Sequence, residues 1–428
     1  MIKMLEVRRA HKLEGRVCVP GDKSISHRAV MLLAISQGQA TINGFLPGED
    51  CLSTIRCFRQ MGVEIEERGS QLVVHGRGLY GLQEPRLPLD CGNSGTTMRL
   101  MSGILAGQDF PSTVTGDQSI RARPMDRIAI PLRKMGAHVE GRDGLDLAPL
   151  EIQGGNLHGI DYTLPVPSAQ VKSAILLAGL YAEGETSVEE KLPARNHTEL
   201  MLEFLGAQIQ SEESRVRIAH SSLEARDIQI PGDISSAAFL VAAAAALPGS
   251  HLVVENVGLN PTRTGILDVL HRMGARIECE NLTNQNGELF GDLIVRGGEL
   301  KGTSITSDLV PRLVDEIPIL AVVASRAHGV TTITGAEELR VKESNRIRAL
   351  FTELSKLGVP VHELSDGLVV EGKSEILGGE VTSYGDHRMA MALAIAGLFA
   401  REPVRISDSQ CVNVSFPGFG RLLSTITK

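Results

Sequence analysis

The chain has 428 residues, of which 42% are hydrophobic and 3% aromatic, with no tryptophan and a formal net charge of −8. This length can bury a large core and favours two or more domains. The negative charge and the shortage of aromatic side chains argue against a nucleic-acid surface. No apolar run approaches the roughly 18 residues that span a bilayer, and the first 15 residues lack the apolar region of a secretory leader, so we expect a cytoplasmic protein without a membrane anchor.

The first predicted element is an apolar helix within the segment 20–38, PGDKSISHRAVMLLAISQG, with Lys23, Ser24 and Arg28 near its start. Comparable segments, rich in Ala, Leu, Ile and Met, recur along the chain at residues 94–107, 168–184, 235–249, 311–329 and 386–400. They are apolar most of the way round, so each of these helices must be buried on nearly all faces. Their N-terminal turns carry the polar residues.

A hexamer pattern recurs between these helices: MGVEIE, MGAHVE, LGAQIQ, MGARIE and LGVPVH begin at residues 61, 135, 205, 273 and 357. Each copy follows a helix-like segment, and its glycine fits the C′ position with positive φ that precedes an alternating strand. The whole chain therefore reads as six copies of a mixed α/β unit of about 70 residues.

Six units suggest two domains of three units each. A matching Pro-Gly-Asp-x-Ser turn occurs at residues 20–24 and 231–235, which indicates that the chain crosses between domains twice. We therefore predict one domain over residues 22–231 and a second formed by residues 1–21 and 232–428, with the site in the cleft between them. Two such domains are expected to close on a ligand.

Cationic side chains accompany the starts of the buried helices and the matching loops. Unpaired N–H groups and the macrodipole make a helix N-terminus an anion site. For any single position the ordinary interpretation is an N-cap or a solvated arginine. Because the arrangement repeats, we favour a focused basic site for small anionic substrates in an acidic protein.

Other common sites are not supported. The segment GRGLYG at residues 76–81 matches GxGxxG, but Pro85 and Pro88 follow, so no dinucleotide-binding helix can begin there. The segment GDKS has neither glycine of a Walker A loop, and HExxH and GxSxG are absent. The six cysteines form no CxxC pair, which favours neither a disulfide framework nor a zinc site. We expect no metal and no nucleotide cofactor.

Eight motifs together carry a family resemblance: GDKSISHRA, GNSGTTMRL, RARPMDR, PSAQVKSA, NPTRTG, VDEIPILA, RVKESNRI and GDHRMAMA. In this order they resemble the 5-enolpyruvylshikimate-3-phosphate synthase family, and SAQVKSA with RNHTE is most similar to its class II bacterial subgroup. The resemblance covers nearly the whole chain. It implies a two-domain inside-out α/β barrel with six βαβαββ repeats, three per domain.

The resemblance also implies a reaction and its substrates. Phosphoenolpyruvate would give its enolpyruvyl group to the 5-hydroxyl of shikimate 3-phosphate and release phosphate, as a step of aromatic amino acid biosynthesis. Shikimate 3-phosphate would be bound by Lys23, Ser24, Arg28, Ser168, Ala169, Gln170, Arg195, Asp315 and Lys342. Phosphoenolpyruvate would be bound by Lys23, Gly95, Arg123, Gln170, Arg346 and Arg388.

The chemistry requires a general acid and a general base, because C3 of phosphoenolpyruvate is protonated while a hydroxyl attacks C2. Our hypothesis makes Asp315 the base for the 5-hydroxyl and Glu343 the acid and base at C3. Lys23 and Lys342 would stabilise developing charge. The ordinary interpretation of Glu343 is a salt bridge to a nearby arginine.

Two alternatives remain open. The related UDP-N-acetylglucosamine enolpyruvyl transferases share the fold and the donor, but they have a catalytic cysteine where this chain has Gln118, and Lys-Asn where it has Lys23 and Ser24. A non-catalytic anion-binding protein on the same scaffold is the second alternative. The small-molecule substrates are the expected partners, and we take a monomer as the default.

Overall fold

The structure is a computed structural model, and it describes residues 4–428, which divide into two compact units. Unit 1 comprises the chain up to Pro20, Pro231–Thr283 and Leu289–Lys428, and unit 2 comprises Gly21–Ile230 and Asn284–Glu288. Each unit has its own hydrophobic core. Among residues 4–428, no helix is both long and apolar enough to cross a membrane.

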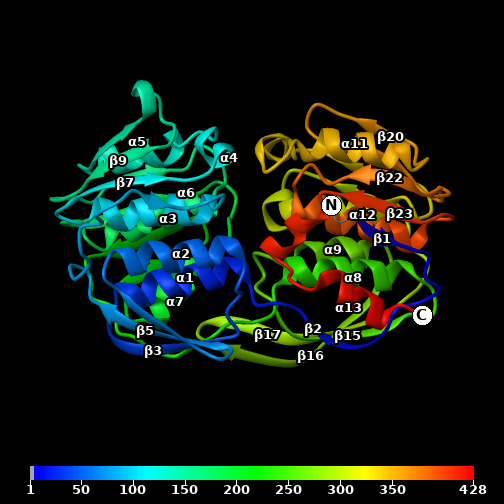
Figure 1. The fold of residues 1–428 in the computed structure, drawn as a ribbon, viewed down its shortest axis with the longest axis horizontal. Helices are drawn as coiled ribbons and strands as arrows, with labels where there is room; N and C mark the ends of the chain where they lie inside the picture. Colours follow the sequence, from blue (N-terminus) through cyan, green and yellow to red (C-terminus); the bar gives the residue numbers. More distant parts are fainter. Residues whose placement is uncertain (1–3) are drawn as a thin grey trace. The chain divides into compact units, whose positions relative to one another are not determined.

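Unit 2 is built from sheets that surround buried helices (Figure 1). Its sheets have the orders β14 (Ile228–Gln229), β3 (Gln37–Asn43), β5 (Gln71–Arg77), β4 (Glu64–Arg68); β6 (Leu89–Asp90), β7 (Pro111–Thr115), β9 (Leu150–Gln153), β8 (His138–Gly141); and β10 (Asp161–Thr163), β11 (Glu185–Glu189), β13 (Arg215–Ala219), β12 (Ile209–Ser211). Its helices are α1 (Lys23–Ala34), α2 (Glu49–Gln60), α3 (Gly95–Ala106), α4 (Gln118–Arg121), α5 (Asp126–Lys134), α6 (Ala169–Gly179), α7 (His197–Phe204) and the short η1 (Arg142–Gly144).

Unit 1 repeats this plan. Its sheets have the orders β16 (Arg276–Gln285), β17 (Glu288–Arg296), β15 (His251–Gly258), β2 (Glu14–Cys18); β18 (Ser304–Ile305), β19 (Val330–Ile333), β21 (Leu368–Glu371), β20 (Val361–Glu363); and β1 (Leu5–Val7), β23 (Val404–Ser407), β22 (Gly379–Thr382). Its helices are α8 (Ile234–Ala246), α9 (Gly265–Arg272), α10 (Ile317–Ala324), α11 (Arg346–Lys356), α12 (His387–Phe399) and α13 (Phe419–Ile426), with the 3₁₀ turns η2 (Val310–Arg312), η3 (Val314–Glu316), η4 (Glu337–Val341) and η5 (Ser409–Val414).

The βαβαββ repeat is seen in the order β6, α3, β7, α5, β8, β9, where β6 and β7 are parallel and β9 is antiparallel to both β7 and β8. Two repeats borrow a strand from elsewhere in the chain: β14 pairs with β3, and β2 pairs with β15. The last repeat differs from the prediction. It lacks the closing hairpin, and β1 from the start of the chain lies antiparallel to β23 instead. This is also the repeat without the hexamer.

The glycines of the five hexamers confirm their predicted conformation. Gly62, Gly136, Gly206, Gly274 and Gly358 have φ values of 83°, 107°, 93°, 91° and 85°. Each directly follows the C-cap residue of its helix, α2, α5, α7, α9 or α11. A residue with a Cβ atom is strained at such angles, so the pattern marks the same turn in each repeat.

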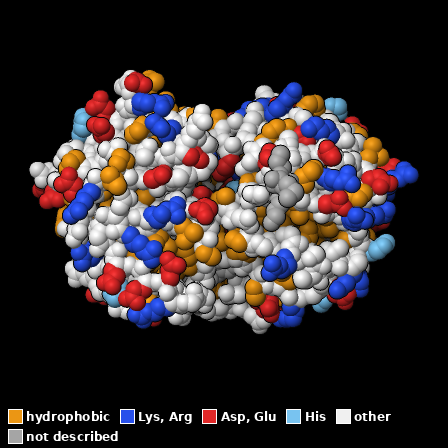
Figure 2. All heavy atoms as spheres, in the orientation of Figure 1, with side chains coloured by type: hydrophobic (Ala, Val, Ile, Leu, Met, Phe, Trp, Pro, Cys, Tyr) orange, Lys and Arg blue, Asp and Glu red, His pale blue; other side chains and the backbone are white. Residues whose placement is uncertain are grey.

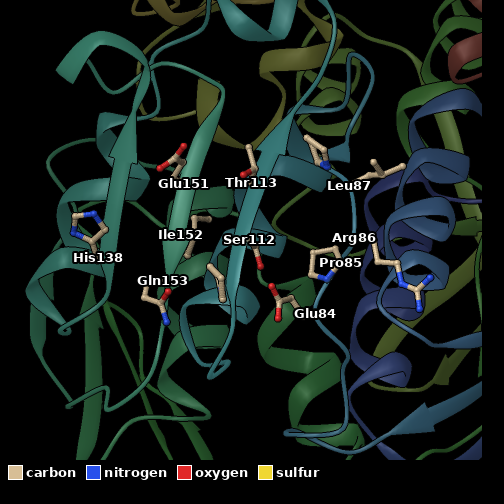
Figure 3. Close-up of a pocket in the computed structure, with 12 residues that line it drawn as sticks. Glu84, Pro85, Arg86, Leu87, Ser112, Thr113, His138, Glu151, Ile152 and Gln153 are labelled. Atoms are coloured by element: carbon tan, nitrogen blue, oxygen red, sulfur yellow. The ribbon is translucent and has the colours of Figure 1, made fainter.

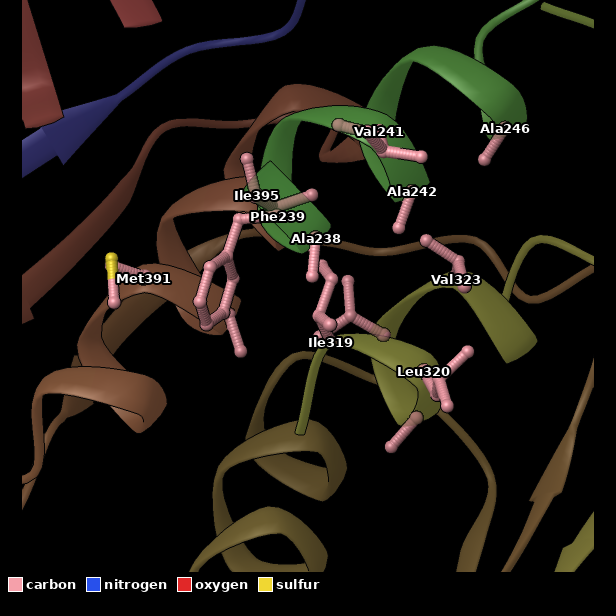
Figure 4. Close-up of a cluster of buried hydrophobic side chains, with 14 of the residues drawn as sticks. Ala238, Phe239, Val241, Ala242, Ala246, Ile319, Leu320, Val323, Met391 and Ile395 are labelled. Carbon is pink, nitrogen blue, oxygen red and sulfur yellow. The ribbon is translucent and has the colours of Figure 1, made fainter. Parts of the chain in front are cut away.

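The predicted apolar helices form the two cores. In unit 1, helices α8, α10 and α12 pack on one another, and Figure 4 shows Phe239 of α8 beside Ile319 of α10 and Met391 of α12. Within α8, every residue is buried. A helix buried on all faces cannot move independently of its neighbours, so the core fixes where each helix begins and which residues its first turn presents.

One boundary differs from the prediction. The segment 311–329 was expected to be one buried helix, but residues 310–316 form the short turns η2 and η3, and α10 begins at Ile317. Pro318 explains the position, because proline lacks an N–H group and is tolerated only in the first turn of a helix. Asp315 therefore lies in η3, just before α10.

Candidate active site

In unit 2, the predicted residues gather at the N-terminal turns of three buried helices. Lys23 and Ser24 begin α1, Gly95 begins α3, and Ala169 and Gln170 begin α6. The caps are side-chain acceptors: Asp22 accepts the N–H of Ile25, Ser94 that of Thr97 and Ser168 that of Val171. Each cap satisfies one of the free N–H groups, and the others remain available for an anion.

Arg28 of α1 connects this helix to α6 and α7. Its Nε donates to the hydroxyl of Thr198 at 2.7 Å, and its Nη2 donates to that of Ser173 at 2.9 Å. A third bond runs from Nη1 to the backbone oxygen of Ser24 at 3.0 Å. Arg28 is 4% exposed. This residue, predicted to bind shikimate 3-phosphate, is therefore also a structural link between α1, α6 and α7.

Gln170 joins α6 to α3. Its amide oxygen accepts from Nη1 of Arg99 at 2.8 Å, and its amide nitrogen donates to the hydroxyl of Thr96 at 3.0 Å. Arg99 was not predicted, although it lies four residues after Gly95 in the motif GNSGTTMRL. A Cβ atom on Gly95 would lie 2.7 Å from Nη1 of Arg99 and 3.5 Å from Nη1 of Arg123. Gly95, Gln170 and both arginines thus belong to one cluster.

The remaining predicted cations of unit 2 have defined positions. Nζ of Lys23 lies 3.2 Å from the carboxylate of Asp50, at the start of α2. Nη2 of Arg123 donates to Oδ1 of Asn93 at 2.6 Å and to the hydroxyl of Ser119 at 3.2 Å. Arg195 is half-buried in the loop between β11 and α7.

The side chain of His27, in α1, is fully buried beside this cluster. Its Nδ1 lies 2.7 Å from the hydroxyl of Thr54, which is hydrogen-bonded to Thr97 at 2.8 Å. Thr97 in turn donates to the N-cap Ser94 at 2.7 Å. Burial lowers the pKa of His27 to about 3, so the imidazole is neutral and serves to connect α1, α2 and α3. The two threonines were not predicted, because their burial is not visible in the sequence.

In unit 1, the predicted residues gather around the buried side chain of Arg346, which is 1% exposed. Its guanidinium donates to Asp386 at 2.7 Å, to Glu343 at 2.7 Å and to Asp315 at 3.2 Å. Burial opposes the charge of Arg346, but these carboxylates outweigh it and raise its pKa. Burial also opposes ionisation of Asp386, yet the charge of Arg346 holds the pKa of Asp386 below its usual value. Asp386 was not predicted, although it lies in the motif GDHRMAMA.

Arg388 lies at the start of α12 beside the same carboxylates. Its Nε is 3.7 Å from Asp315, and its Nη1 is 3.6 Å from Glu316. Glu316 also accepts a hydrogen bond from Ser235, which contacts Arg263. Lys342 lies apart from these contacts and pairs with Glu338 at 2.7 Å. Asp315 and Glu343, the two predicted acid-base groups, are thus held by one arginine.

A cavity of about 430 Å³ lies elsewhere in unit 2 and contains none of the predicted residues. Figure 3 shows it between the segment Glu84 to Leu87 and the strands that carry Thr113 and Glu151.

Side chains of both charge signs are interspersed over the face of the molecule seen in Figure 2. In residues 4–428, the one group of three possible metal-ligating side chains is Glu64, Glu66 and His75, on β4 and β5. Arg68 already binds Glu66 at 2.8 Å. These features lie outside the predicted site.

The model of the family EPSP synthase (3-phosphoshikimate 1-carboxyvinyltransferase) matches residues 7–423 of this chain. The chain belongs to the EPSP synthase family. A relative from Alkaliphilus metalliredigens, named 3-phosphoshikimate 1-carboxyvinyltransferase, is 60% identical over 99% of this chain and 100% of its own length. A relative of the same name from Brevibacillus brevis is 52% identical over the same shares of the two chains.

Solved structures agree with this assignment. An EPSP synthase from Acinetobacter baumannii superposes with a TM-score of 0.90 at 45% identity, covering 99% of this chain and 98% of that one. A second structure of EPSP synthase from this organism gives a TM-score of 0.89 at 43% identity. The likeness confirms the predicted family and the mixed α/β fold with its repeated small sheets.

Proposed function

We propose that this chain transfers the enolpyruvyl group of phosphoenolpyruvate to the 5-hydroxyl of shikimate 3-phosphate and releases phosphate. The observation that carries the proposal is the cluster of cations at the joined N-terminal turns of α1, α3 and α6. Phosphoenolpyruvate and shikimate 3-phosphate both carry a phosphate and a carboxylate, so an enzyme that binds both needs several fixed cations. Family membership supports the same reaction.

Unit 2 would bind most of shikimate 3-phosphate. Lys23, Ser24, Arg28 and Arg195 would hold its charged groups, with Ser168, Ala169 and Gln170 from the first turn of α6. Arginine suits this task because its planar fork bonds phosphate bidentately and stays protonated. The bonds from Arg28 to Thr198 and Ser173 support the assignment, since they hold the guanidinium in one orientation.

Phosphoenolpyruvate would be held by Lys23, Gly95, Arg123 and Gln170 of unit 2 together with Arg346 and Arg388 of unit 1. Gly95 lets an anion approach the first turn of α3, where a side chain would take up the space next to Arg99. For Arg346, contact with substrate stays a prediction, because its donors bind Asp386, Glu343 and Asp315. Its ion pairs support a second task, the placement of the two acid-base carboxylates.

The reaction breaks the C–O bond of phosphoenolpyruvate. Glu343 would protonate C3 while Asp315 takes the proton of the 5-hydroxyl, whose oxygen attacks C2. The tetrahedral adduct then loses a proton from C3 and expels phosphate, which restores the double bond. Lys23 and Lys342 would stabilise the developing charges. Asp315 and Lys342 would also orient the hydroxyl groups of the acceptor.

The test is phosphate release from phosphoenolpyruvate with either shikimate 3-phosphate or UDP-N-acetylglucosamine as acceptor, without added metal or nucleotide. We expect release with shikimate 3-phosphate alone, and the bridging oxygen of phosphoenolpyruvate should leave in the phosphate. Release with the sugar nucleotide instead would change the acceptor. Tight binding of both anions without release would mean a binding protein.

We further propose that the enzyme works in the cytoplasm as a monomer. The bacterial relatives named as 3-phosphoshikimate 1-carboxyvinyltransferase support a role in aromatic amino acid biosynthesis. Sedimentation of the purified chain with and without both substrates tests the oligomeric state. A mass of 45.9 kDa under both conditions is expected.

A further inference from the structure

A buried group of three charged residues lies behind the first turn of α6. Nζ of Lys172 is 2.7 Å from a carboxylate oxygen of Glu190 and 2.7 Å from one of Glu199. The three side chains are 1%, 6% and 4% exposed. Burial opposes the charge of Lys172, but Glu199 and Glu190 outweigh it and raise its pKa, so the side chain is an ammonium ion. Burying such charges costs several kcal/mol per ion, and apolar residues of equal volume often serve stability as well.

Two members of this group bind the backbone N–H and C=O groups of one loop residue, Ala194. Oε2 of Glu190 accepts the backbone N–H of Ala194 at 3.1 Å, and Nζ of Lys172 donates to the backbone oxygen of Ala194 at 3.4 Å. The loop 190–196 has no helix or strand of its own, and residues 191–193 are exposed. Ala194 is 6% exposed, so it is the buried anchor of this loop. The next residue along the chain is Arg195.

The third member connects the same group to α7. Glu199 lies in the first turn of α7, next to Thr198, which binds Arg28. Lys172 similarly precedes Ser173, the other partner of Arg28. Two polar networks therefore run side by side between α6 and α7, one through Arg28 and one through Lys172. The first holds Arg28 and the second holds the loop that carries Arg195, and both arginines are predicted to bind shikimate 3-phosphate.

We propose that Lys172 and Glu190 are positioning residues for Arg195, which they place for bonding to the phosphate of shikimate 3-phosphate. This inference rests on the proposed function of Arg195. A bidentate arginine–phosphate pair requires its partners to lie within about 0.5 Å of the productive geometry. A loop without secondary structure meets that requirement only if its backbone is fixed, and the bonds to both backbone groups of Ala194 fix it next to Arg195.

The experiment is a double-mutant cycle on the affinity for shikimate 3-phosphate, measured by calorimetry on the full chain. Lys172→Met keeps an unbranched apolar side chain that is one atom shorter and removes the ammonium. We expect it to raise the Kd of shikimate 3-phosphate roughly tenfold, and to leave the KM of phosphoenolpyruvate within about twofold. In an Arg195→Ala background, Lys172→Met should have no further effect, because it acts through Arg195. Lys356→Met, which removes an ion pair with the buried Glu353 in unit 1, is the matched control and should change neither constant.

A second pair of variants keeps the test valid if Lys172→Met folds poorly. Glu190→Gln retains an oxygen that can accept the N–H of Ala194, so its Kd should stay within about threefold of the wild type. Glu190→Leu has no acceptor and should show the tenfold loss. Equal losses in these two variants, or losses that add to that of Arg195→Ala, would overturn the positioning role. If the unaltered protein fails to bind shikimate 3-phosphate at all, the proposed function falls, whereas normal binding by Lys172→Met removes this inference alone.

Discussion

The ammonium group of Lys23 lies 3.2 Å from the carboxylate of Asp50, and both side chains are largely buried. The ion pair holds a cation at the first turn of α1, where the N-terminal N–H groups also attract anions. Lys23 is the residue for which we propose contact with both substrates.

Lys23→Gln should lower kcat/KM for both substrates by about 100-fold, since a charge-assisted hydrogen bond is worth roughly 1.5–3 kcal/mol. Steady-state kinetics with each substrate varied in turn measures the effect. Lys12→Gln, which removes an exposed ion pair with Glu14, is the control and should leave both constants unchanged. A loss confined to one substrate would contradict the shared contact.

Gly95→Ala should weaken the binding of phosphoenolpyruvate more than the binding of shikimate 3-phosphate. The new methyl group would lie 2.7 Å from Nη1 of Arg99, so the guanidinium must move away from Gln170. We expect the KM of phosphoenolpyruvate to rise roughly tenfold, or about 1.4 kcal/mol. Gly298→Ala places a methyl group 3.3 Å from Arg276 in unit 1 and should alter neither KM. An equal change in both constants would place Gly95 in a role common to the two substrates.

Asp315→Asn should reduce kcat by 10²–10⁴-fold, the usual contribution of a general base. Binding of shikimate 3-phosphate should weaken by less than tenfold, because the amide can still bond to a hydroxyl group. Single-turnover kinetics and calorimetry separate the two effects. Asp308→Asn, an exposed aspartate of the same unit, is the control. If kcat is retained, Asp315 is not the base.

Glu343→Gln should slow proton transfer at C3 of phosphoenolpyruvate. The measurement is the incorporation of solvent deuterium at C3, followed by mass spectrometry during turnover. We expect exchange and kcat to fall together by at least 100-fold. Glu337 is an exposed glutamate at the start of η4. The control variant Glu337→Gln should show normal deuterium exchange. Normal exchange in Glu343→Gln would leave Glu343 only its ion pair with Arg346.

The buried His27 should make unfolding depend on pH. Its pKa is about 3 in the folded chain against 6.5 in the unfolded one, so between these values the unfolded chain binds the extra proton. The contribution of His27 to the free energy of unfolding is fully present above pH 6.5 and decreases as the pH falls toward 3. At pH 5 the loss from this group is about 2 kcal/mol. Urea unfolding measures the effect. Between pH 7 and 5, the free energy of unfolding of His27→Gln should fall by about 2 kcal/mol less than that of the wild type. His11→Gln, at an exposed position, should lose as much as the wild type.

The structural features that could be predicted from the sequence are those that recur in each repeat or that lie at the ends of helices. The hexamer glycines and the apolar helices recur, so their conformation and burial could be inferred from pattern alone. The missing hairpin of the last repeat was not foreseen, because its place is taken by β1, about 400 residues earlier in the chain. Pairing over such distances leaves no local signal.

Residues at the site were predicted less evenly. Lys23, Gly95 and Gln170 lie in the first turns of their helices, where the expected anion site placed them. Their partners Asp50, Arg99 and Thr96 became visible only through packing, because the burial of a polar side chain cannot be read from the sequence. Lys172 was part of a quoted motif, yet its burial between two carboxylates could not be inferred from spacing.

The pairing of β1 with β23 affects the order in which the chain can fold during synthesis on the ribosome. Most of unit 2 is one continuous stretch that emerges early, so it can fold while the rest of the chain is still being made. The segment that becomes β1 leaves the ribosome well before its partner β23, which ends at Ser407. At 5–20 residues per second, β1 waits roughly 20–80 s for that partner. The chain therefore completes this sheet only after the strands of the other five sheets have been synthesised.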